Sequence, residues 1–388
     1  MEPVLLDASN LLVGGGVQVA ASLIDELLLM RHDGDTVRAH PWLETLCIQA
    51  SPEVIANVVT KDLAQIQVPT RQKWWARERW ITRGRNEFAL QWTVFGPRYG
   101  WKRAPIVVTG IADVTSVYHW PIGVPKGPIR NRLKRAVRGP IARKLFQGES
   151  LLVSESEALL DVFCRRTGYP RERTKTIPNA VNSAVLEAAR RPGRDLSLAP
   201  RPMGVDYRLV YVARGYPHKN HEFLTQLHAE LLLLGVSVEF VVTLSESEWA
   251  ERTRQFRAVC KNVGVIPVSA VADLYFQCDA VIFPSLLESF SATPIEAMAT
   301  NGRIFASDRP FVREVCGDTV TYIDPLNPQT AAVAIVDTMR DAEKLESMKE
   351  RAMELAGRQV DAAARARAFV EVISAILDGN ENERATTP

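Results

Sequence analysis

The sequence predicts an α/β protein made of two domains, each built on a parallel β-sheet covered by helices. The chain has 388 residues, which is too long for one typical hydrophobic core. Apolar runs of strand length alternate with amphipathic stretches, as in strand–helix–strand units. The alternation stops at 185–207, where Pro, Arg and Gly accumulate without a clear period, and then restarts. This interruption predicts an interdomain linker.

The first block of elements predicts an N-terminal domain at 1–184. An apolar run at 3–9 predicts a strand, which leads through three glycines into an amphipathic helix. Buried strands are expected at 104–110 and 150–156, the second followed by a helix. A further strand at 174–181 ends in a Pro-Asn turn.

The second block predicts a C-terminal domain at 208–358. A helix and tail at 359–388 follow it without a further strand, and packing of this helix on the N-terminal domain is one option. The expected strands of the second block lie at 208–213, 236–244, 263–268, 279–284 and 303–307, and the expected helices at 220–235, 245–262, 270–278 and 293–302.

Two glutamates in the stretch 284–302 point to a strand–loop–helix turn. One continuous helix would direct Glu288 and Glu296 about 80° apart, and Pro294 resists a helix interior. A strand at 280–283, a loop with Glu288 and a helix from Pro294 carrying Glu296 fit better, with Thr293 as the N-cap. The alternative is structural, because both Thr293–Glu296 and Ser285–Glu288 have the spacing of capping boxes.

Composition excludes several classes of protein. With 46% hydrophobic and 24% charged residues, the chain is typical of soluble globular proteins. Its five cysteines are scattered and form no CxxC pair, so a zinc site or disulfide framework is not indicated. No signal segment or apolar run of membrane-spanning length is present, and a reducing, cytoplasmic location is expected.

Charge is distributed unevenly along the chain. Residues 1–184 hold 25 Lys and Arg against 17 Asp and Glu, whereas the remainder holds 22 against 28. The basic excess concentrates at 71–85, among three tryptophans, and at 126–144, which has eight basic residues and no acidic one. Such stretches suit an anionic membrane or nucleic acid, and a solvated basic helix is an equal alternative. Because no nucleic-acid-reading motif is present, we expect docking on the inner face of the plasma membrane and no nucleic acid.

Four segments in order carry a resemblance to a known family. They are 211–220, 263–285, 288–299 and 308–328, and weaker likenesses occur at 13–20, 151–163 and 177–182. The chain resembles the retaining glycosyltransferases of family 4, the glycosyl transferases group 1. This resemblance implies the GT-B fold, in which two Rossmann-like domains face each other across a cleft.

The resemblance also implies roles for individual residues. A nucleotide diphosphate sugar would be bound by Arg214 and Lys219 through its diphosphate, and by Glu296 through its ribose. Glu288 would face the transferred sugar. Backbone N–H groups at a helix start attract phosphate; those expected to contribute belong to Ser289, Phe290, Ser291, Ala292 and Thr293. Gly14, Gly15 and Gly16 would let the acceptor or the diphosphate approach the backbone.

The chain departs from the family pattern in two places. The loop after Glu288 has serine and alanine where the family often has glycines. The family often places a histidine near the transferred sugar; His119 is the candidate here, although Asp113 lies closer to the preceding strand and a structural histidine is an alternative. Asp33 and Asp35 match the DxD metal motif of another fold but stand in a polar turn, so no metal or other cofactor is expected.

The predicted function is transfer of a hexose from a nucleotide sugar to a glycan or lipid-linked acceptor, with retention, in cell-surface polysaccharide synthesis. The alternative is a nucleotide-sugar-binding or scaffold protein with impaired catalysis. The missing loop glycines and the uncertain histidine favour this alternative.

Overall fold

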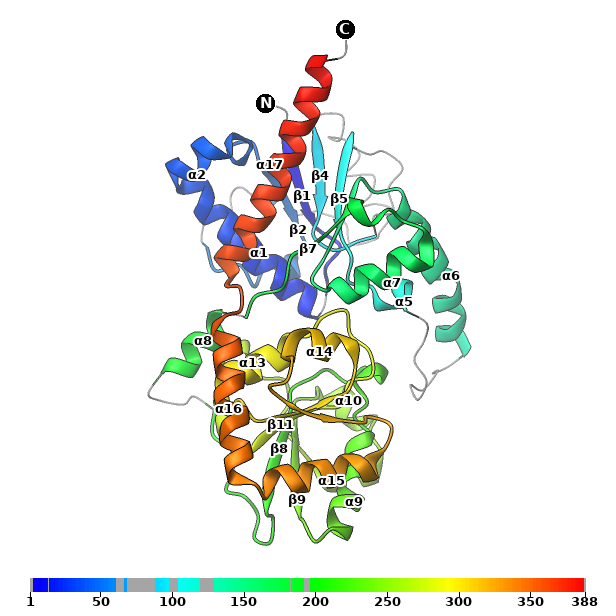
Figure 1. Cartoon of the computed structure of the whole chain (residues 1–388), viewed down its shortest axis with the longest axis vertical. Coiled ribbons are helices and arrows are strands. Elements are labelled where there is room, and N and C mark those ends of the chain that lie inside the picture. The colour runs from blue at the N-terminus through cyan, green and yellow to red at the C-terminus, as the bar shows by residue number, and fades with distance from the viewer. Residues whose placement is uncertain are drawn as a thin grey trace. The chain divides into compact units, whose positions relative to one another are not determined.

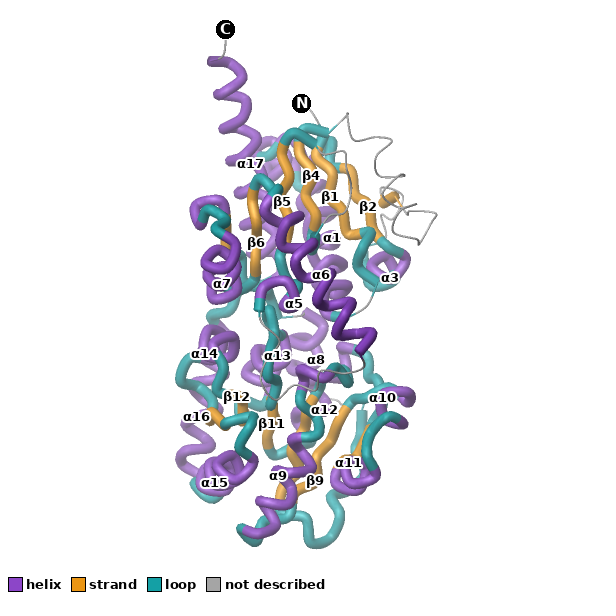
Figure 2. Tube along the Cα trace, turned by 90° about the vertical axis from the view of Figure 1, so that its right-hand side faces the viewer, coloured by secondary structure: helices purple, strands orange, loops and turns teal. Residues whose placement is uncertain are grey.

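The chain forms two units, each with its own parallel sheet (Figures 1 and 2). The computed structural model describes residues 3–12, 14–60, 66–67, 88–97, 104–118, 129–181, 183–191 and 196–386. Among these, the first unit comprises the residues up to 118, together with 130–179 and 360 onward, and the second comprises Ile129 and 180–359. The chain therefore leaves the first unit more than once and returns to it each time.

The first unit has a sheet of seven parallel strands in the order β3-β2-β1-β4-β5-β6-β7. A parallel sheet needs cover on both faces. Helices α1 and α17 lie side by side on one face (Figure 1). A smaller apolar cluster joins α5, α6 and α7 to β6. The strands are β1 (Val4–Ala8), β2 (Cys47–Ala50), β3 (Ile66–Gln67), β4 (Leu90–Thr93), β5 (Ile106–Gly110), β6 (Leu151–Ser154) and β7 (Thr174–Thr176). The helices are α1 (Gly15–His32), α2 (Gly34–Ala39), α3 (Pro52–Ile55), α5 (Val114–Val117), α6 (Ile129–Gln147), α7 (Glu157–Thr167) and α17 (Ala362–Thr386).

The C-terminal helix α17 is part of the first unit's core. Phe369 stacks on the fully buried Trp92 of β4, with ring centroids 4.8 Å apart. The Ser374 hydroxyl contacts both the His40 ring and the Trp42 indole N–H, at 2.7 and 2.8 Å. These contacts join the two ends of the chain within one unit.

The second unit has six parallel strands in the order β10-β9-β8-β11-β12-β13. One apolar core packs the sheet between its helices, with α9 against α15 and α12 against α13 and α8. The strands are β8 (Tyr207–Tyr211), β9 (Val238–Val242), β10 (Cys260–Asn262), β11 (Ala280–Phe283), β12 (Ile304–Ser307) and β13 (Thr321–Ile323). The helices are α8 (Ser183–Arg190), α9 (Phe223–Leu233), α10 (Glu246–Ala250), α11 (Arg254–Val259), α12 (Val271–Phe276), α13 (Ala292–Thr300), α14 (Pro310–Cys316), α15 (Pro328–Met339) and α16 (Ala342–Gly357).

Three local expectations from the sequence differ from the structure. The segment expected as a linker, 185–207, begins within α8, because Val185 and Ala188 form a short apolar face that is buried in the second core. The helix expected at 245–262 is two short helices, since the Thr253 side chain caps a new helix start. The strand expected at 263–268 is instead β10, which pairs with β9 through the buried Cys260.

Candidate functional site

The second unit brings two loops together where its strand order reverses. From β8, the chain first builds outward through β9 and β10, and then continues on the other side with β11. The loops that follow β8 and β11 therefore leave the same edge of the sheet as neighbours. Ligands of open parallel sheets bind at this kind of switch point, beyond the carboxyl ends of the strands. The first loop carries Arg214 and Lys219, and the second carries Glu288.

A buried tyrosine joins these two loops. Tyr211, the last residue of β8, is fully buried, and its hydroxyl lies 2.9 Å from the Lys219 carbonyl and 2.8 Å from the Ser285 hydroxyl. Because a carbonyl oxygen can only accept, Tyr211 donates to Lys219, and the Ser285 hydroxyl then donates to Tyr211. Burial raises the pKa of Tyr211 well above its usual value, so the phenol keeps this proton.

An ion pair spans the same two loops. The Lys219 Nζ atom lies 2.6 Å from Oε1 of Glu288, and both side chains are nearly buried, at 14% and 9% exposed. The Leu286 N–H donates to the His218 carbonyl at 2.8 Å, which adds a backbone link. Burial lowers the pKa of His218, and Lys219 lowers it further against the opposing effect of Glu288. The pair therefore holds a positive and a negative charge side by side at the sheet edge.

Helix α13 starts beside this pair, two residues earlier than expected. Its N-cap is Ser291 rather than Thr293, and within the described residues no side chain caps the helix start. The Thr293 hydroxyl donates instead to the Val212 carbonyl at 3.2 Å, just beyond β8. That bond holds the helix start at the switch point, and neither predicted capping box forms. The first N–H groups of α13 are therefore without a side-chain partner.

The other predicted residues of this region lie on the same loop and helix. Ser289, Ser291 and Ala292 are partly exposed, and Phe290 packs against the core of the unit. Glu296 lies in α13. The residue as a whole is partly exposed, but its carboxyl group is buried, and this burial raises its pKa to about 7. Arg214 is half exposed, and its Nε lies 3.0 Å from Oε1 of Glu248, a residue that the sequence analysis missed.

In the first unit, the three glycines form the start of α1. Gly14 is the N-cap with a φ of 81°, a conformation that glycine adopts at little cost, and Gly15 and Gly16 begin the helix. A Cβ atom added at Gly14 or Gly15 would meet no atom of the described residues within 4 Å. This open helix start also lies at a switch point, because β1 is flanked by β2 and β4.

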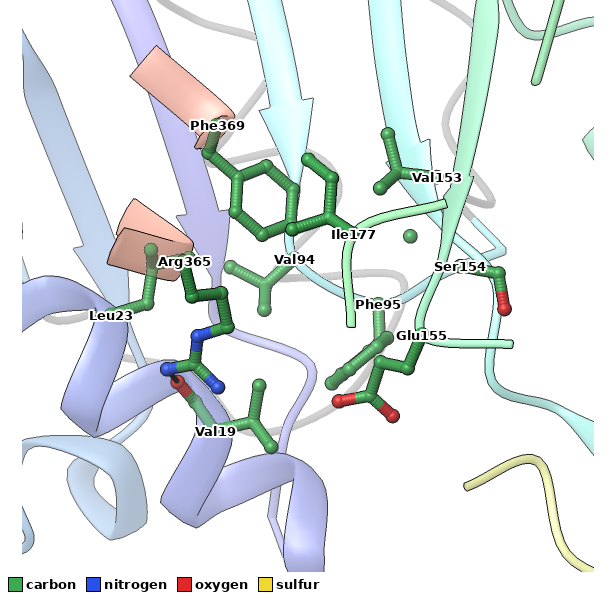
Figure 3. A pocket seen from close by; sticks show the side chains of 11 residues that line it. Val19, Leu23, Val94, Phe95, Val153, Ser154, Glu155, Ile177, Arg365 and Phe369 are labelled. Atoms are coloured by element: carbon green, nitrogen blue, oxygen red, sulfur yellow. Dashed lines mark hydrogen bonds between the residues drawn. The ribbon is translucent and has the colours of Figure 1, made fainter. Parts of the chain in front are cut away.

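The first unit also contains a small pocket at the carboxyl ends of β5 and β6 (Figure 3). Apolar side chains from α1, α17 and the loop after β4 surround two ionisable groups, Glu155 and Arg365. Arg365 is 3% exposed and donates to the Asn179 side chain, the Val19 carbonyl and the Ser22 hydroxyl. Burial raises the pKa of Glu155 to about 7, although the nearby Arg365 opposes this shift. The cavity volume of about 20 Å³ has room for about one water molecule.

Several predicted features lie outside the described residues. They include His119 and the stretch 71–85 with its three tryptophans. Another tryptophan of the first unit, Trp92, is buried in the core. Asp33 caps α2 through Thr36, which lowers its pKa, and Asp35 pairs with Arg38. In the described part of the chain, no group of three metal-ligating side chains is found.

Comparison with known families identifies the second unit. Residues 203–355 match the family model of the glycosyl transferases group 1. These residues make up most of the second unit, which is therefore similar to a group 1 glycosyltransferase domain. This match confirms the resemblance inferred from the four segments of the sequence.

One curated relative is the O-antigen chain mannosyltransferase RfbU of Salmonella typhimurium. It is 24% identical over 140 residues, which are 34% of this chain and 38% of that protein. The match therefore spans well under half of that relative.

Solved structures resemble nearly the whole chain. Anabaena Alr3699/HepE in complex with UDP and glucose has a TM-score of 0.67 at 17% identity, covering 96% of this chain and 99% of that one. A glycosyltransferase from Rickettsia africae has a TM-score of 0.65 at 16% identity, covering 97% and 99%. At these identities the likeness concerns the fold, and it confirms the predicted α/β architecture of the GT-B type.

A first prediction concerns Tyr211 of the second unit. Tyr211→Phe should lower the free energy of unfolding by about 1–3 kcal/mol, because the buried Lys219 carbonyl and Ser285 hydroxyl lose their partner. Chemical denaturation followed by circular dichroism measures this change. Tyr216→Phe is the matched control, since Tyr216 is 40% exposed in the loop that follows β8. Equal effects of the two substitutions would contradict the role given to Tyr211.

A second prediction concerns Glu155. Its pKa in the folded protein is raised to about 7 from an ordinary value near 4.5, so the folded state prefers the neutral form. Stability from this group is therefore present at low pH and is lost as pH rises through about 7. Glu155→Gln should raise the free energy of unfolding by on the order of 1–2 kcal/mol at pH 8 and leave it unchanged at pH 4.5. Glu371→Gln, on the exposed side of α17, should change neither value; a pH-independent effect at Glu155 would refute the prediction.

Proposed function

We propose that the chain is a retaining glycosyltransferase of family 4 that moves a hexose from a nucleotide diphosphate sugar to a glycan or lipid-linked acceptor. The observation that carries this proposal is the convergence of Arg214, Lys219 and the start of α13 at the switch point of the unit that matches the group 1 family model. Two cations and a set of unpartnered N–H groups suit a diphosphate, whose negative charge grows as the sugar leaves.

Glu296 and Glu288 complete the proposed donor site. An ionised Glu296 can accept hydrogen bonds from both ribose hydroxyls. Glu288 is held next to Lys219, so its second oxygen can accept from a sugar hydroxyl while the lysine faces phosphate. Transfer with retention of the sugar's anomeric configuration then needs no separate acid and base. The leaving phosphate can take the proton from the acceptor hydroxyl on the same face of the sugar. The protein positions groups and stabilises charge.

The proposed chemistry uses charges that the chain itself supplies. Arg214 and Lys219 neutralise the leaving diphosphate, so the proposal assigns no resident metal ion or cofactor. His119 stays the candidate near the transferred sugar. The glycine-rich start of α1 is proposed to admit the acceptor or the diphosphate close to the backbone, since among the described residues no atom would touch a Cβ at Gly14 or Gly15.

Relatives support the substrate classes. The structures of HepE hold UDP, UDP-glucose, or UDP with glucose, which supports a nucleotide sugar as donor. RfbU is named for mannosyl transfer to an O-antigen chain, which supports a hexose and a role in cell-surface polysaccharide synthesis.

The helix α6 supports docking on an anionic membrane from the cytoplasmic side. In its described part, Val137 and Ile141 are 56% and 49% exposed one turn apart, next to the exposed Arg138 and Lys144. An apolar stripe flanked by basic residues suits a lipid interface. No helix among the described residues combines the length and apolar character needed to cross a membrane.

The third prediction tests the donor site. Lys219→Ala should lower transfer of the sugar by roughly 10²–10³-fold, because the leaving diphosphate loses a cation. Glu296→Gln should weaken binding of the nucleotide diphosphate and remove its pH dependence. In the natural protein, affinity should rise as pH passes upward through about 7, where Glu296 ionises.

Calorimetric titration with UDP, GDP and ADP, together with assays of the corresponding sugar nucleotides, measures both effects. Lys344→Ala, an exposed lysine of α16, is the control and should bind and transfer normally. Donor binding without transfer or hydrolysis in the natural protein would favour the scaffold alternative. Near-normal activity of Lys219→Ala would rule out the site.

The fourth prediction concerns the membrane. The protein should sediment with vesicles of phosphatidylglycerol, less so with phosphatidylcholine, and less again as salt increases. Val137→Ser with Ile141→Ser should weaken this binding, and so should replacement by glutamine of Arg132, Lys134, Arg135 and Arg138. Donor hydrolysis should be unchanged in both variants. Lys175→Gln, on β7, is the control; binding that ignores lipid charge and salt would argue against docking.

A further inference from the structure

The loop that carries Arg214 is held on both sides of its next residue, Gly215. The Gly215 N–H donates to Oε1 of Glu248 at 2.9 Å. Nη2 of Arg252 donates to the Gly215 carbonyl at 2.7 Å. Gly215 is therefore hydrogen-bonded on both sides, by Glu248 of α10 and by Arg252 just beyond this helix.

Gly215 packs closely against the side chains of Glu248 and Arg252. An added Cβ atom would lie 2.7 Å from Nη2 of Arg252 and 3.0 Å from Cγ of Glu248. Both neighbours are occupied by the hydrogen bonds just described, so they have little freedom to withdraw. The spacing between loop and helix is therefore set by the absence of a side chain at Gly215.

Glu248 itself is held by the start of α10. Its Oε2 accepts from the N–H and the hydroxyl of Ser245, both at 2.9 Å, in a complete capping box. Its Oε1 accepts from Gly215 and from Nε of Arg214 at 3.0 Å. Burial opposes ionisation of Glu248, but these hydrogen bonds outweigh it and lower its pKa to about 2. The carboxylate is thus held in its charged form and oriented chiefly by Ser245 and Gly215, with Arg214 as a further partner.

The contact with Glu248 uses only one edge of the Arg214 guanidinium. Among the described residues, the two terminal nitrogens of Arg214 have no hydrogen-bond partner, and the side chain is 49% exposed. A carboxylate that competed with phosphate would be expected to engage these terminal nitrogens. A carboxylate that binds only Nε leaves the two terminal nitrogens of the guanidinium available for bidentate recognition of phosphate.

We propose that Glu248 is a positioning residue, which orients Arg214 so that its terminal nitrogens face the diphosphate of the donor. The inference rests on the proposed function and adds a residue to it. Ser245, Gly215 and Arg252 contribute to this arrangement, because they hold the start of α10 next to the loop that carries Arg214.

Calorimetric binding of UDP, GDP and ADP to the full chain tests this inference. The variants are Glu248→Gln, Arg214→Ala and the two combined, each checked for folding by thermal unfolding. Glu246→Gln is the matched control, because Glu246 is exposed on the same helix and loses the same charge. For the nucleotide that binds best, Glu248→Gln should weaken affinity by about tenfold, and the control should not.

The double variant separates positioning from other roles. Once Arg214 is alanine, Glu248→Gln should have no further effect on affinity, since Glu248 acts through that side chain. Equal losses in both backgrounds would overturn the inference and show that Glu248 only supports the loop. Tighter binding by Glu248→Gln would also overturn it and show that the carboxylate competes with phosphate. If the natural protein bound none of the three nucleotides, the proposed function would fail first, and this inference with it.

Discussion

The candidate site depends on the buried hydroxyl group of Tyr211. Two loops leave the same edge of the second sheet, and each has backbone and side-chain polar groups that must find partners once they are buried. Tyr211 meets this need for both loops at once, by donating to the Lys219 carbonyl and accepting from Ser285. Because a phenol in this position has a raised pKa, the arrangement does not change with pH in the physiological range. The ion pair of Lys219 with Glu288 is therefore formed on a scaffold that is already fixed.

Each of the two cations around the site is paired with a glutamate. Lys219 is held by Glu288, and Arg214 is held by Glu248, so neither cation must be ordered when an anion binds. Ordering a long basic side chain costs up to about 2 kcal/mol, and a pre-formed pair avoids most of this cost. The N-terminus of α13, held in place through Thr293, adds N–H groups that no side chain of the described residues caps. These elements come from three separate segments, which the parallel topology brings to one edge.

In the first unit, buried polar contacts attach the C-terminal helix α17 to the N-terminal part of the chain. Arg365 lies near the start of α17, shortly after the chain returns to this unit, and donates to Asn179, where the chain leaves it. Further hydrogen bonds to Val19 and Ser22 attach the same guanidinium to α1. Burying this charge has a cost, which the hydrogen bonds to Asn179, Val19 and Ser22 offset. The residue is therefore well suited to fixing α17 on the sheet.

The sequence by itself determined the strand–helix alternation, the two sheets and most of the residues proposed for the donor site. Apolar periodicity is a local property, and the order and spacing of Arg214, Lys219, Glu288 and Glu296 can be read along the chain. The capping box of Ser245 and Glu248 could also be recognised from its spacing. Only the tertiary structure decided what these groups contact: Glu248 meets Arg214, Thr293 bonds to Val212 instead of capping its helix, and Arg365 reaches Asn179. Each of these partners is distant in sequence. Parallel strand pairing brings Glu248 and Val212 to their partners, and the packing of α17 on the first sheet brings Arg365 to Asn179. No local pattern encodes either arrangement.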